Sequence, residues 1–155
     1  MRYLTPNLLA GAIFLTDRVL KFWFLQHPAF RQDVFVGLLQ FRYATNMGIA
    51  FGVVLPRLVL IIAITIVLAV VVMALAQAYR QHANAQIFFL TLLLAGAISN
   101  VLDRIRFGFV VDYINIPFFT VFNLADCMIT LGVLGLLWAH WKTNRLQKRS
   151  LDKQA

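Results

Sequence analysis

Long apolar runs constrain this chain more than any other feature of its sequence. The clearest run, residues 58–76, is interrupted only by Thr65, and about 20 mostly apolar residues are enough for a helix to cross a membrane. Apolar residues make up 61% of the chain and charged residues 13%, whereas about a quarter of the residues in soluble domains are charged. The sequence therefore predicts an integral membrane protein, and its length predicts a single domain, 1–155.

Four apolar runs predict four transmembrane helices. They lie at approximately residues 7–25, 57–77, 86–104 and 126–142. The first run is the weakest, because it contains Asp17, Arg18 and Lys21. It resembles a signal peptide but continues to Leu25, so we expect a retained helix rather than a cleaved leader. An even number of spans places both termini on one side, and the basic tail, 143–155, indicates that this side is cytoplasmic.

Two segments would then lie outside the membrane, 26–56 and 105–125. Alternation typical of a strand marks the first of them, at Val34, Val36, Leu39, Phe41 and Tyr43. The second also begins with strand-forming residues and is interrupted by Pro117. We therefore expect a small antiparallel sheet on the outer membrane surface. The predicted fold class is an all-α membrane protein, with four transmembrane helices and a small extracytoplasmic β-sheet.

The acidic residues are few and unusually placed. The chain has no glutamate and six aspartates, of which Asp112 and Asp126 flank a short outer segment beside apolar runs. A carboxylate is expensive there, so a functional role is the default hypothesis. If the two carboxylates lie within about 6 Å of each other, one pKa rises and they titrate as a coupled pair. Such a pair suits amide hydrolysis, because one carboxylate can take a proton from water while the other donates one to the scissile carbonyl oxygen. Taken alone, Asp126 could also be a first-turn acid favoured by the helix dipole.

Two pairs of polar residues have both a structural and a functional interpretation. Asp17 and Lys21 are spaced i, i+4 with the acid first, which favours an ion pair on one helix face. This pair either lets two charges enter the membrane together or positions a substrate. Asn46 and Gly48 fit a sharp turn, which either simply precedes the second span or brings the backbone close to a ligand.

A polar face is predicted near the end of the third span. Gly96, Asn100 and Arg104 are spaced by four residues and lie on nearly one helix face. Asp103 lies one residue off this face, with Arg104 as its nearby basic residue. The glycine permits close helix packing, the asparagine needs a hydrogen-bond partner, and the arginine offers five donors in a planar fork. The alternative is a helix-packing motif followed by an arginine at the membrane interface.

Several classes of chemistry find no support in the sequence. There is no HExxH, GxSxG or P-loop motif, and the three histidines lack the spacing of metal ligands. The single cysteine, Cys127, excludes an internal disulfide framework. The net charge of +8 comes mostly from the ends of apolar runs and from the tail, and no nucleic-acid partner is expected.

Two other functions remain open at this point. A small transporter or channel component could use the aspartates as a proton or ion relay. A non-catalytic assembly protein could use its polar residues only to join helices. A relay predicts polar residues along the depth of a span, whereas residues 58–76 are almost purely apolar.

Five short motifs, in order along the chain, resemble those of the bacterial lipoprotein signal peptidases (signal peptidase II), which are membrane aspartic peptidases. The matching residues are Asp17 and Lys21 in TDRVLKF; Asn46, Gly48, Ala50 and Phe51 in an NxGxAF motif; Gly96, Asn100, Asp103 and Arg104 in GxxxNxxDR; residues 110–113 in VVDF; and Phe122, Asn123, Ala125 and Asp126 in FNxAD. The chain departs from the pattern at Leu102, Tyr113 and Cys127, and none of these departures touches the acids. Any one motif is weak evidence, but five in order are specific.

The resemblance implies removal of the signal peptide from diacylglyceryl-modified prolipoproteins, with the cut just before the lipidated cysteine. It implies that Asp112 and Asp126 are the catalytic pair. The supporting and substrate-binding residues would be Asp17, Lys21, Asn46, Gly48, Asn100, Asp103, Arg104 and Asn123. The segment 26–56 would cradle the substrate, no metal or organic cofactor is needed, and globomycin-type cyclic peptides and membrane lipid are further expected ligands. The enzyme would be a monomer in the bacterial cytoplasmic (inner) membrane, with both termini cytoplasmic and its site at the extracytoplasmic face.

Overall fold

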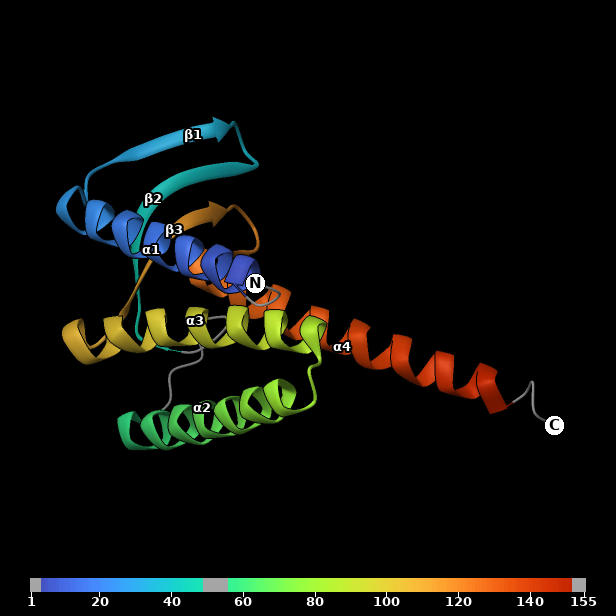
Figure 1. Cartoon of the computed structure of the whole chain (residues 1–155). Coiled ribbons are helices and arrows are strands. Elements are labelled where there is room, and N and C mark those ends of the chain that lie inside the picture. Colours follow the sequence, from blue (N-terminus) through green and yellow to red (C-terminus); the bar gives the residue numbers. More distant parts are fainter. Residues whose placement is uncertain (1–3, 49–55, 152–155) are drawn as a thin grey trace.

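A computed structural model describes residues 4–48 and 56–151 of the chain. These residues form four helices, α1 (Leu4–Gln26), α2 (Arg57–Arg80), α3 (Asn84–Phe107) and α4 (Leu124–Leu151). They also form four strands, β1 (Arg31–Phe35), β2 (Leu39–Asn46), β3 (Val110–Ile116) and β4 (Thr120–Phe122) (Figure 1). The motif residues Ala50 and Phe51 lie outside the described residues.

Three helices in the described part of the chain, α2, α3 and α4, are long and apolar enough to cross a membrane. The apolar side chains of α2 are mostly exposed along its length, as expected for a helix that faces lipid. The 23 residues of α1 would extend about 35 Å, which also exceeds the thickness of the hydrocarbon core. Whereas α2 is charged only at its two ends, Arg57 and Arg80, α1 carries Asp17, Arg18 and Lys21 within its length.

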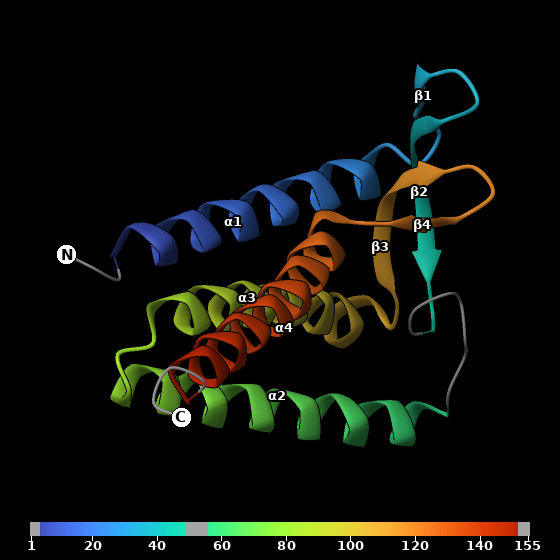
Figure 2. The ribbon, with the colours of Figure 1, turned by 90° about the vertical axis from the view of Figure 1, so that its right-hand side faces the viewer.

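The central helix is α3, which packs against α1, α2 and α4 (Figure 2). Gly96 allows α3 and α4 to approach closely, because a Cβ placed there would lie 2.5 Å from Ala125 O and 3.0 Å from the Met128 Cβ. On its other side, Ile87 of α3 is buried against Val71 of α2. The helices therefore form a bundle around α3, and the sheet lies at the end of this bundle where α1 ends and α2 begins.

The strands form one antiparallel sheet in the order β1-β2-β3-β4. The small antiparallel sheet predicted from the sequence is confirmed, and it joins both of the predicted outer segments, because β2 pairs with β3. The register places Ala44 opposite Asp112 and Asn46 opposite Val110. Residues two apart on a strand face the same side. Asn46 is therefore a diagonal neighbour of Asp112, within reach of its side chain.

Short connections lead from the helices into the sheet and back. After α3 ends at Phe107, Gly108 adopts a left-handed conformation (φ 82°) in which its N–H donates to Arg104 O, a common helix ending. Strand β3 ends at Ile116, just before Pro117, which lacks the N–H needed to continue a ladder. Only Asn123 separates β4 from α4. The sheet and the start of α4 are therefore held in a fixed relation.

Gly96→Ala is expected to destabilise the protein, because the new methyl group would overlap the Ala125 carbonyl oxygen and force α3 and α4 apart. Overpacking of this kind costs about 1–3 kcal/mol and should lower the midpoint of thermal unfolding in detergent. Gly11→Ala is the matched control, since a Cβ at Gly11 meets nothing within 4 Å. That change should be neutral or stabilising by roughly 0.5–1 kcal/mol. Equal shifts in the two variants would contradict close packing at Gly96.

Candidate functional site

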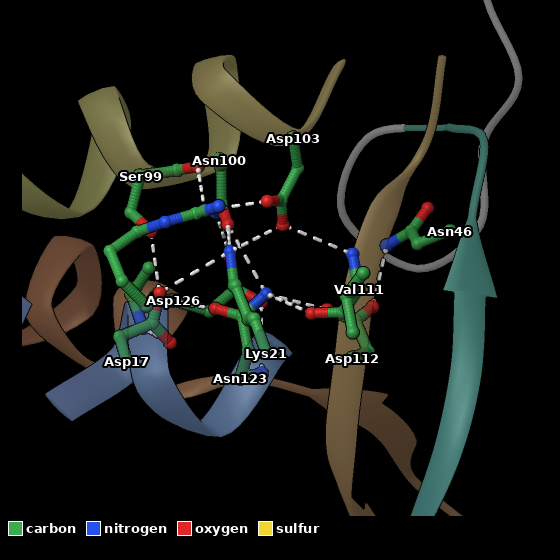
Figure 3. A network of polar contacts seen from close by, with 12 residues as sticks. Asp17, Lys21, Asn46, Ser99, Asn100, Asp103, Val111, Asp112, Asn123 and Asp126 are labelled. Carbon is green, nitrogen blue, oxygen red and sulfur yellow. Dashed lines mark hydrogen bonds and ion pairs between the residues drawn. The ribbon is translucent and has the colours of Figure 1, made fainter. Parts of the chain in front are cut away.

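Buried polar side chains meet where the sheet covers the ends of the helices (Figure 3). They come from α1, α3, β3 and the junction before α4. The buried members are Asp17, Lys21, Ser99, Asn100, Asp103, Asp112 and Asn123. The half-buried Asp126 of α4 joins them. Buried polar groups persist only where they bond one another, so the contacts within this cluster determine its chemistry.

The ammonium group of Lys21 is the centre of the network. Lys21 is 1% exposed, and its Nζ lies 2.9 Å from Asp103 Oδ2 and 3.3 Å from Asp17 Oδ2. It also donates a hydrogen bond of 2.7 Å to Asn100 Oδ1. These partners match the three donors of an ammonium group. The ion pair expected between Asp17 and Lys21 is therefore present, and the same cation also neutralises an acid on α3.

Asp103 has a different partner from the one expected. The sequence favours the neighbouring Arg104 as its partner, but Asp103 Oδ1 lies 2.5 Å from Arg18 Nη1 on α1. Asp103 Oδ2 accepts the N–H of Val111 at 3.2 Å as well as facing Lys21. Adjacent residues on a helix do not face the same side, so Asp103 points toward α1 while Arg104 points away from it.

The first turn of α4 is capped by α1 and β3. The first N–H groups of a helix have no partners within it. Here the N–H of Leu124 donates to the Tyr113 hydroxyl (3.1 Å), and the N–H of Ala125 donates to Asp17 Oδ1 (3.1 Å). The Tyr113 hydroxyl in turn donates to Asp17 Oδ1 (2.9 Å). The negative Asp17 thus lies at the positive end of the α4 dipole, and two other elements fix where α4 starts.

Asn123 and Asp126 cap the same helix reciprocally. The N–H of Asp126 donates to Asn123 Oδ1 (2.8 Å), and the N–H of Asn123 donates to Asp126 Oδ2 (3.3 Å). This is the geometry of a capping box, with asparagine and aspartate at positions where serine or threonine and glutamate are usual. The other oxygen of Asp126, Oδ1, accepts a hydrogen bond from Asn100 Nδ2 (2.7 Å). Both oxygens of Asp126 are therefore held in place.

Asparagines also hold Asp112. Its Oδ1 accepts a hydrogen bond from Asn123 Nδ2 (2.6 Å), and its Oδ2 accepts one from Asn46 Nδ2 (3.1 Å). Every oxygen of Asp112 and Asp126 thus accepts a hydrogen bond from a neutral group. Within residues 4–48 and 56–151, the salt bridges go to Asp17 and Asp103 and none reaches this pair. The pair is therefore positioned without being neutralised.

The surroundings of Asp112 favour its protonated form. Burial is the main cause that raises the pKa of Asp112 to about 7, and the negative charge of Asp126 is the next. Hydrogen bonds from Asn46 and Asn123 and the charge of Lys21 lower this pKa, but by less. At neutral pH a large fraction of the molecules therefore keeps a proton on Asp112. Carboxyl groups in this state can donate a proton as well as accept one.

Arg104 connects the first outer segment to the acids. Its Nη2 donates to Gly48 O (2.6 Å), and the N–H of Gly48 donates to Asn46 Oδ1 (3.0 Å). The Asn46 amide then uses its Nδ2 for Asp112. The turn predicted at Asn46 and Gly48 thus orients the amide toward the acid. The Nε of Arg104 is buried and has no hydrogen-bond partner among the described residues.

A cavity of about 830 Å³ lies beside the acids. Its polar lining includes Asn46, Asn100, Arg104 and Asp126, and its apolar walls come from α2, α3, α4 and the β4 region. The apolar walls include Leu60, Ile64, Val67, Val101 and Leu131. The volume lies within the range of ligand pockets, about 300–1,000 Å³. Such a lining suits an amphiphilic ligand whose polar part reaches the acids.

Every residue predicted for the site is a member of the connected network, but three further members were not singled out. Ser99 donates to Asp17 Oδ2 (2.5 Å), Arg18 pairs with Asp103, and Tyr113 bridges Asp17 to α4. Ser99 and Arg18 are polar residues within apolar runs, and this signal could have identified them. Tyr113 carries no such signal, because tyrosine is common in strands. Among the described residues, no group of three His, Cys, Asp or Glu side chains could hold a metal ion.

The fold and the site together define a membrane enzyme with a carboxylate pair beside an apolar cavity. Residues 9–142 match the family model of signal peptidase (SPase) II. A lipoprotein signal peptidase of Moorella thermoacetica is 31% identical over 133 residues, covering 84% of this chain and 89% of the relative. Another, of Bartonella tribocorum, is 35% identical over 140 residues, covering 86% and 84%. A solved bacterial membrane enzyme matches with a TM-score of 0.78 and 26% identity, covering 90% of this chain and 89% of its own. The chain belongs to the signal peptidase II family and is a membrane-embedded peptidase.

Asp112→Asn is expected to stabilise the protein at alkaline pH. The pKa of Asp112 is raised from 3.8 to about 7 in the folded state, so its contribution to stability is full below about pH 4 and is lost as the pH rises through about 7. Asparagine cannot ionise, so the variant escapes this loss. The midpoint of thermal unfolding of Asp112→Asn, minus that of the wild type, should therefore increase between pH 5 and pH 8. Asp33→Asn, on the exposed strand β1, is the control, and a pH-independent difference at Asp112 would contradict the raised pKa.

Tyr113→Phe is expected to lower both stability and turnover, because it leaves the N–H of Leu124 without its acceptor at the start of α4. An unsatisfied buried donor costs about 1–3 kcal/mol, and the loosened turn carries Asp126. We expect the kcat per folded molecule to fall severalfold with KM unchanged. Tyr79→Phe is the control. Tyr79 lies at the end of α2 far from the sheet, and the change removes only an exposed hydrogen bond that its hydroxyl accepts from Asn7 of α1. Equal kcat values for the two variants would show that Tyr113 does not position α4.

Proposed function

We propose that this chain is an aspartic peptidase that removes signal peptides from lipoproteins, with Asp112 and Asp126 as its catalytic residues. Its relatives in M. thermoacetica and B. tribocorum carry the name lipoprotein signal peptidase. One observation carries the proposal: two carboxyl groups are held by neutral asparagines, and one of them, that of Asp126, lines an apolar cavity together with Asn46 and Asn100. Acids placed in this way can act on a peptide bond whose neighbouring residue is linked to lipid.

In the proposed mechanism, the pair carries one proton at the start. Asp112 holds it, because burial and the charge of Asp126 raise its pKa to about 7. Asp126 takes a proton from water as the water oxygen attacks the scissile carbonyl carbon, and Asp112 donates its proton to the carbonyl oxygen. In the next step Asp126 returns a proton to the amide nitrogen, Asp112 takes one from a hydroxyl of the intermediate, and the C–N bond breaks. The pair is then back in its starting state.

The cavity supports a lipid-modified substrate. Its apolar walls would receive acyl chains, while its polar lining holds Asp126 together with Asn46, Asn100 and Arg104. A cysteine carrying diacylglycerol would then place the peptide bond on its N-terminal side at the acids, and cleavage there releases the signal peptide. Globomycin-type cyclic peptides would compete for the same space. The Nε of Arg104, which has no hydrogen-bond partner among the described residues, supports a role for this side chain in binding the substrate backbone.

The other members of the network are proposed to support the pair rather than to react. Asn46 and Asn123 orient Asp112, and Asn100 orients Asp126. Gly48 connects Asn46 to Arg104. Lys21 donates a hydrogen bond to the side-chain oxygen of Asn100 and so orients this amide. The charge of Lys21 is neutralised by Asp17 and Asp103.

We further propose that α1 is a fourth span of one integral membrane domain, 1–155. Its charges Asp17, Arg18 and Lys21 are paired with one another or with Asp103 on α3, which removes most of the penalty for placing them in a membrane. The sheet and the start of α4 lie at one end of the helices, and the C-terminal end of α4 lies at the other (Figure 2); the acids belong to the first end and the basic tail follows the second. By the positive-inside rule, both termini are cytoplasmic, and the acids face the outer side of the bacterial inner membrane.

Asp112→Asn and Asp126→Asn should each abolish cleavage of a diacylglyceryl-modified prolipoprotein in detergent or vesicles. Loss of an acid or base from such a pair lowers the rate by roughly 10²–10⁴-fold. Thermal unfolding of both variants should remain cooperative, which separates lost chemistry from lost folding. Asp152→Asn, which changes the aspartate of the predicted cytoplasmic tail, should cleave at the rate of the wild type. Cleavage near that rate by either Asp112→Asn or Asp126→Asn would exclude the proposed pair.

A further inference from the structure

The end of α4 farthest from the acids combines tryptophans with cations on one face. Lys142 Nζ lies 5.1 Å from the centre of the Trp138 ring, and Arg145 Cζ lies 5.0 Å from the centre of the Trp141 ring. Trp138 is 52% exposed and Trp141 is 56% exposed, and both cations are exposed too. We call these four residues the basic face of α4. The spacing of its members by three and four residues keeps them together on the helix.

This face lies where α4 would leave a membrane. The apolar span of α4 is Leu124–Thr143, and the helix continues to Leu151, projecting beyond the other helices (Figure 1). The match to the family model ends at residue 142, so the projecting part lies beyond the matched region. In the sequence, Lys148 and Arg149 follow, and no acid occurs between Asp126 and Asp152.

Each feature of the basic face fits one kind of partner. Tryptophan prefers the boundary between hydrocarbon and water, which is the level of the span end. A cation over a tryptophan ring is held near that level by the ring while its charge stays exposed. Basic clusters directly beside a span attract anionic lipids and lose that attraction when salt screens the charges. A soluble acidic partner would not require the tryptophans, so the lipid surface accounts for more of the observations.

We propose that the basic face of α4, formed by Trp138, Trp141, Lys142 and Arg145, is a binding site for the headgroups of anionic phospholipids. The site lies at the opposite end of the helices from the acids. It selects lipids by their negative charge and holds them against the tryptophan rings. This proposal does not depend on the peptidase mechanism, because it involves none of the catalytic or supporting residues.

The tryptophans allow a direct test, because the chain has only one other tryptophan, Trp23, which lies on α1 near the sheet. The Trp23→Phe variant would be placed in phosphatidylcholine vesicles containing phosphatidylglycerol, with bromine on the acyl chains of one lipid or the other at equal mole fraction. We expect brominated phosphatidylglycerol to quench the emission of Trp138 and Trp141 about twofold more than brominated phosphatidylcholine at low salt. In about 0.5 M salt the two lipids should quench equally.

The double substitution Lys142→Gln and Arg145→Gln should remove the preference for phosphatidylglycerol. Arg106→Gln is the matched control, because Arg106 also lies over an aromatic ring, that of Phe107, but at the sheet end of α3. It should leave the preference unchanged. Equal quenching by both lipids at low salt in Trp23→Phe would overturn the proposal, and so would a preference that persists in high salt. The salt comparison uses the unaltered basic face, so it decides the matter even if the double variant folds poorly.

Discussion

The contact on which the rest of the site depends is that of the Lys21 ammonium group with Asp17, Asp103 and Asn100. A lone buried ammonium would be too costly to keep charged. Here its partners come from α1 itself and from α3, so the cost is offset only when the two helices are packed together. The same contact orients the Asn100 amide, whose other end holds Asp126. One cation therefore couples helix packing to the geometry of an acid.

The charges of the network are divided between two groups of aspartates. Asp17 and Asp103 receive the cations, whereas Asp112 and Asp126 receive only neutral donors. A salt bridge would fix a carboxylate but would also hold it ionised. Hydrogen bonds from amides fix it and lower its pKa by less than burial raises it, as at Asp112. This division of charges is what the proposed exchange of protons between Asp112 and Asp126 requires.

The start of α4 shows how separate parts of the chain position one carboxyl group, that of Asp126. Asp17 of α1 and Tyr113 of β3 accept the first N–H groups of the helix, and Asn123 accepts the next. Each acceptor satisfies a donor that a helix end leaves open. Asp126 therefore stands on a turn that is held by three segments, so its position does not depend on the turn alone. The basic face lies at the far end of the same helix.

Much of this arrangement could be predicted from the sequence, because apolar runs, strand alternation and the spacing of polar residues are local properties. They determined the four helices, the antiparallel strands and the residues that gather at the site. Local spacing could not decide which acids are neutralised. It assigned Arg104 to Asp103, whereas the partner is Arg18 on another helix, and it gave Tyr113 no role. Only the tertiary structure decided these partners, because an ion pair or a cap forms between groups that packing brings together, however far apart they stand in the chain.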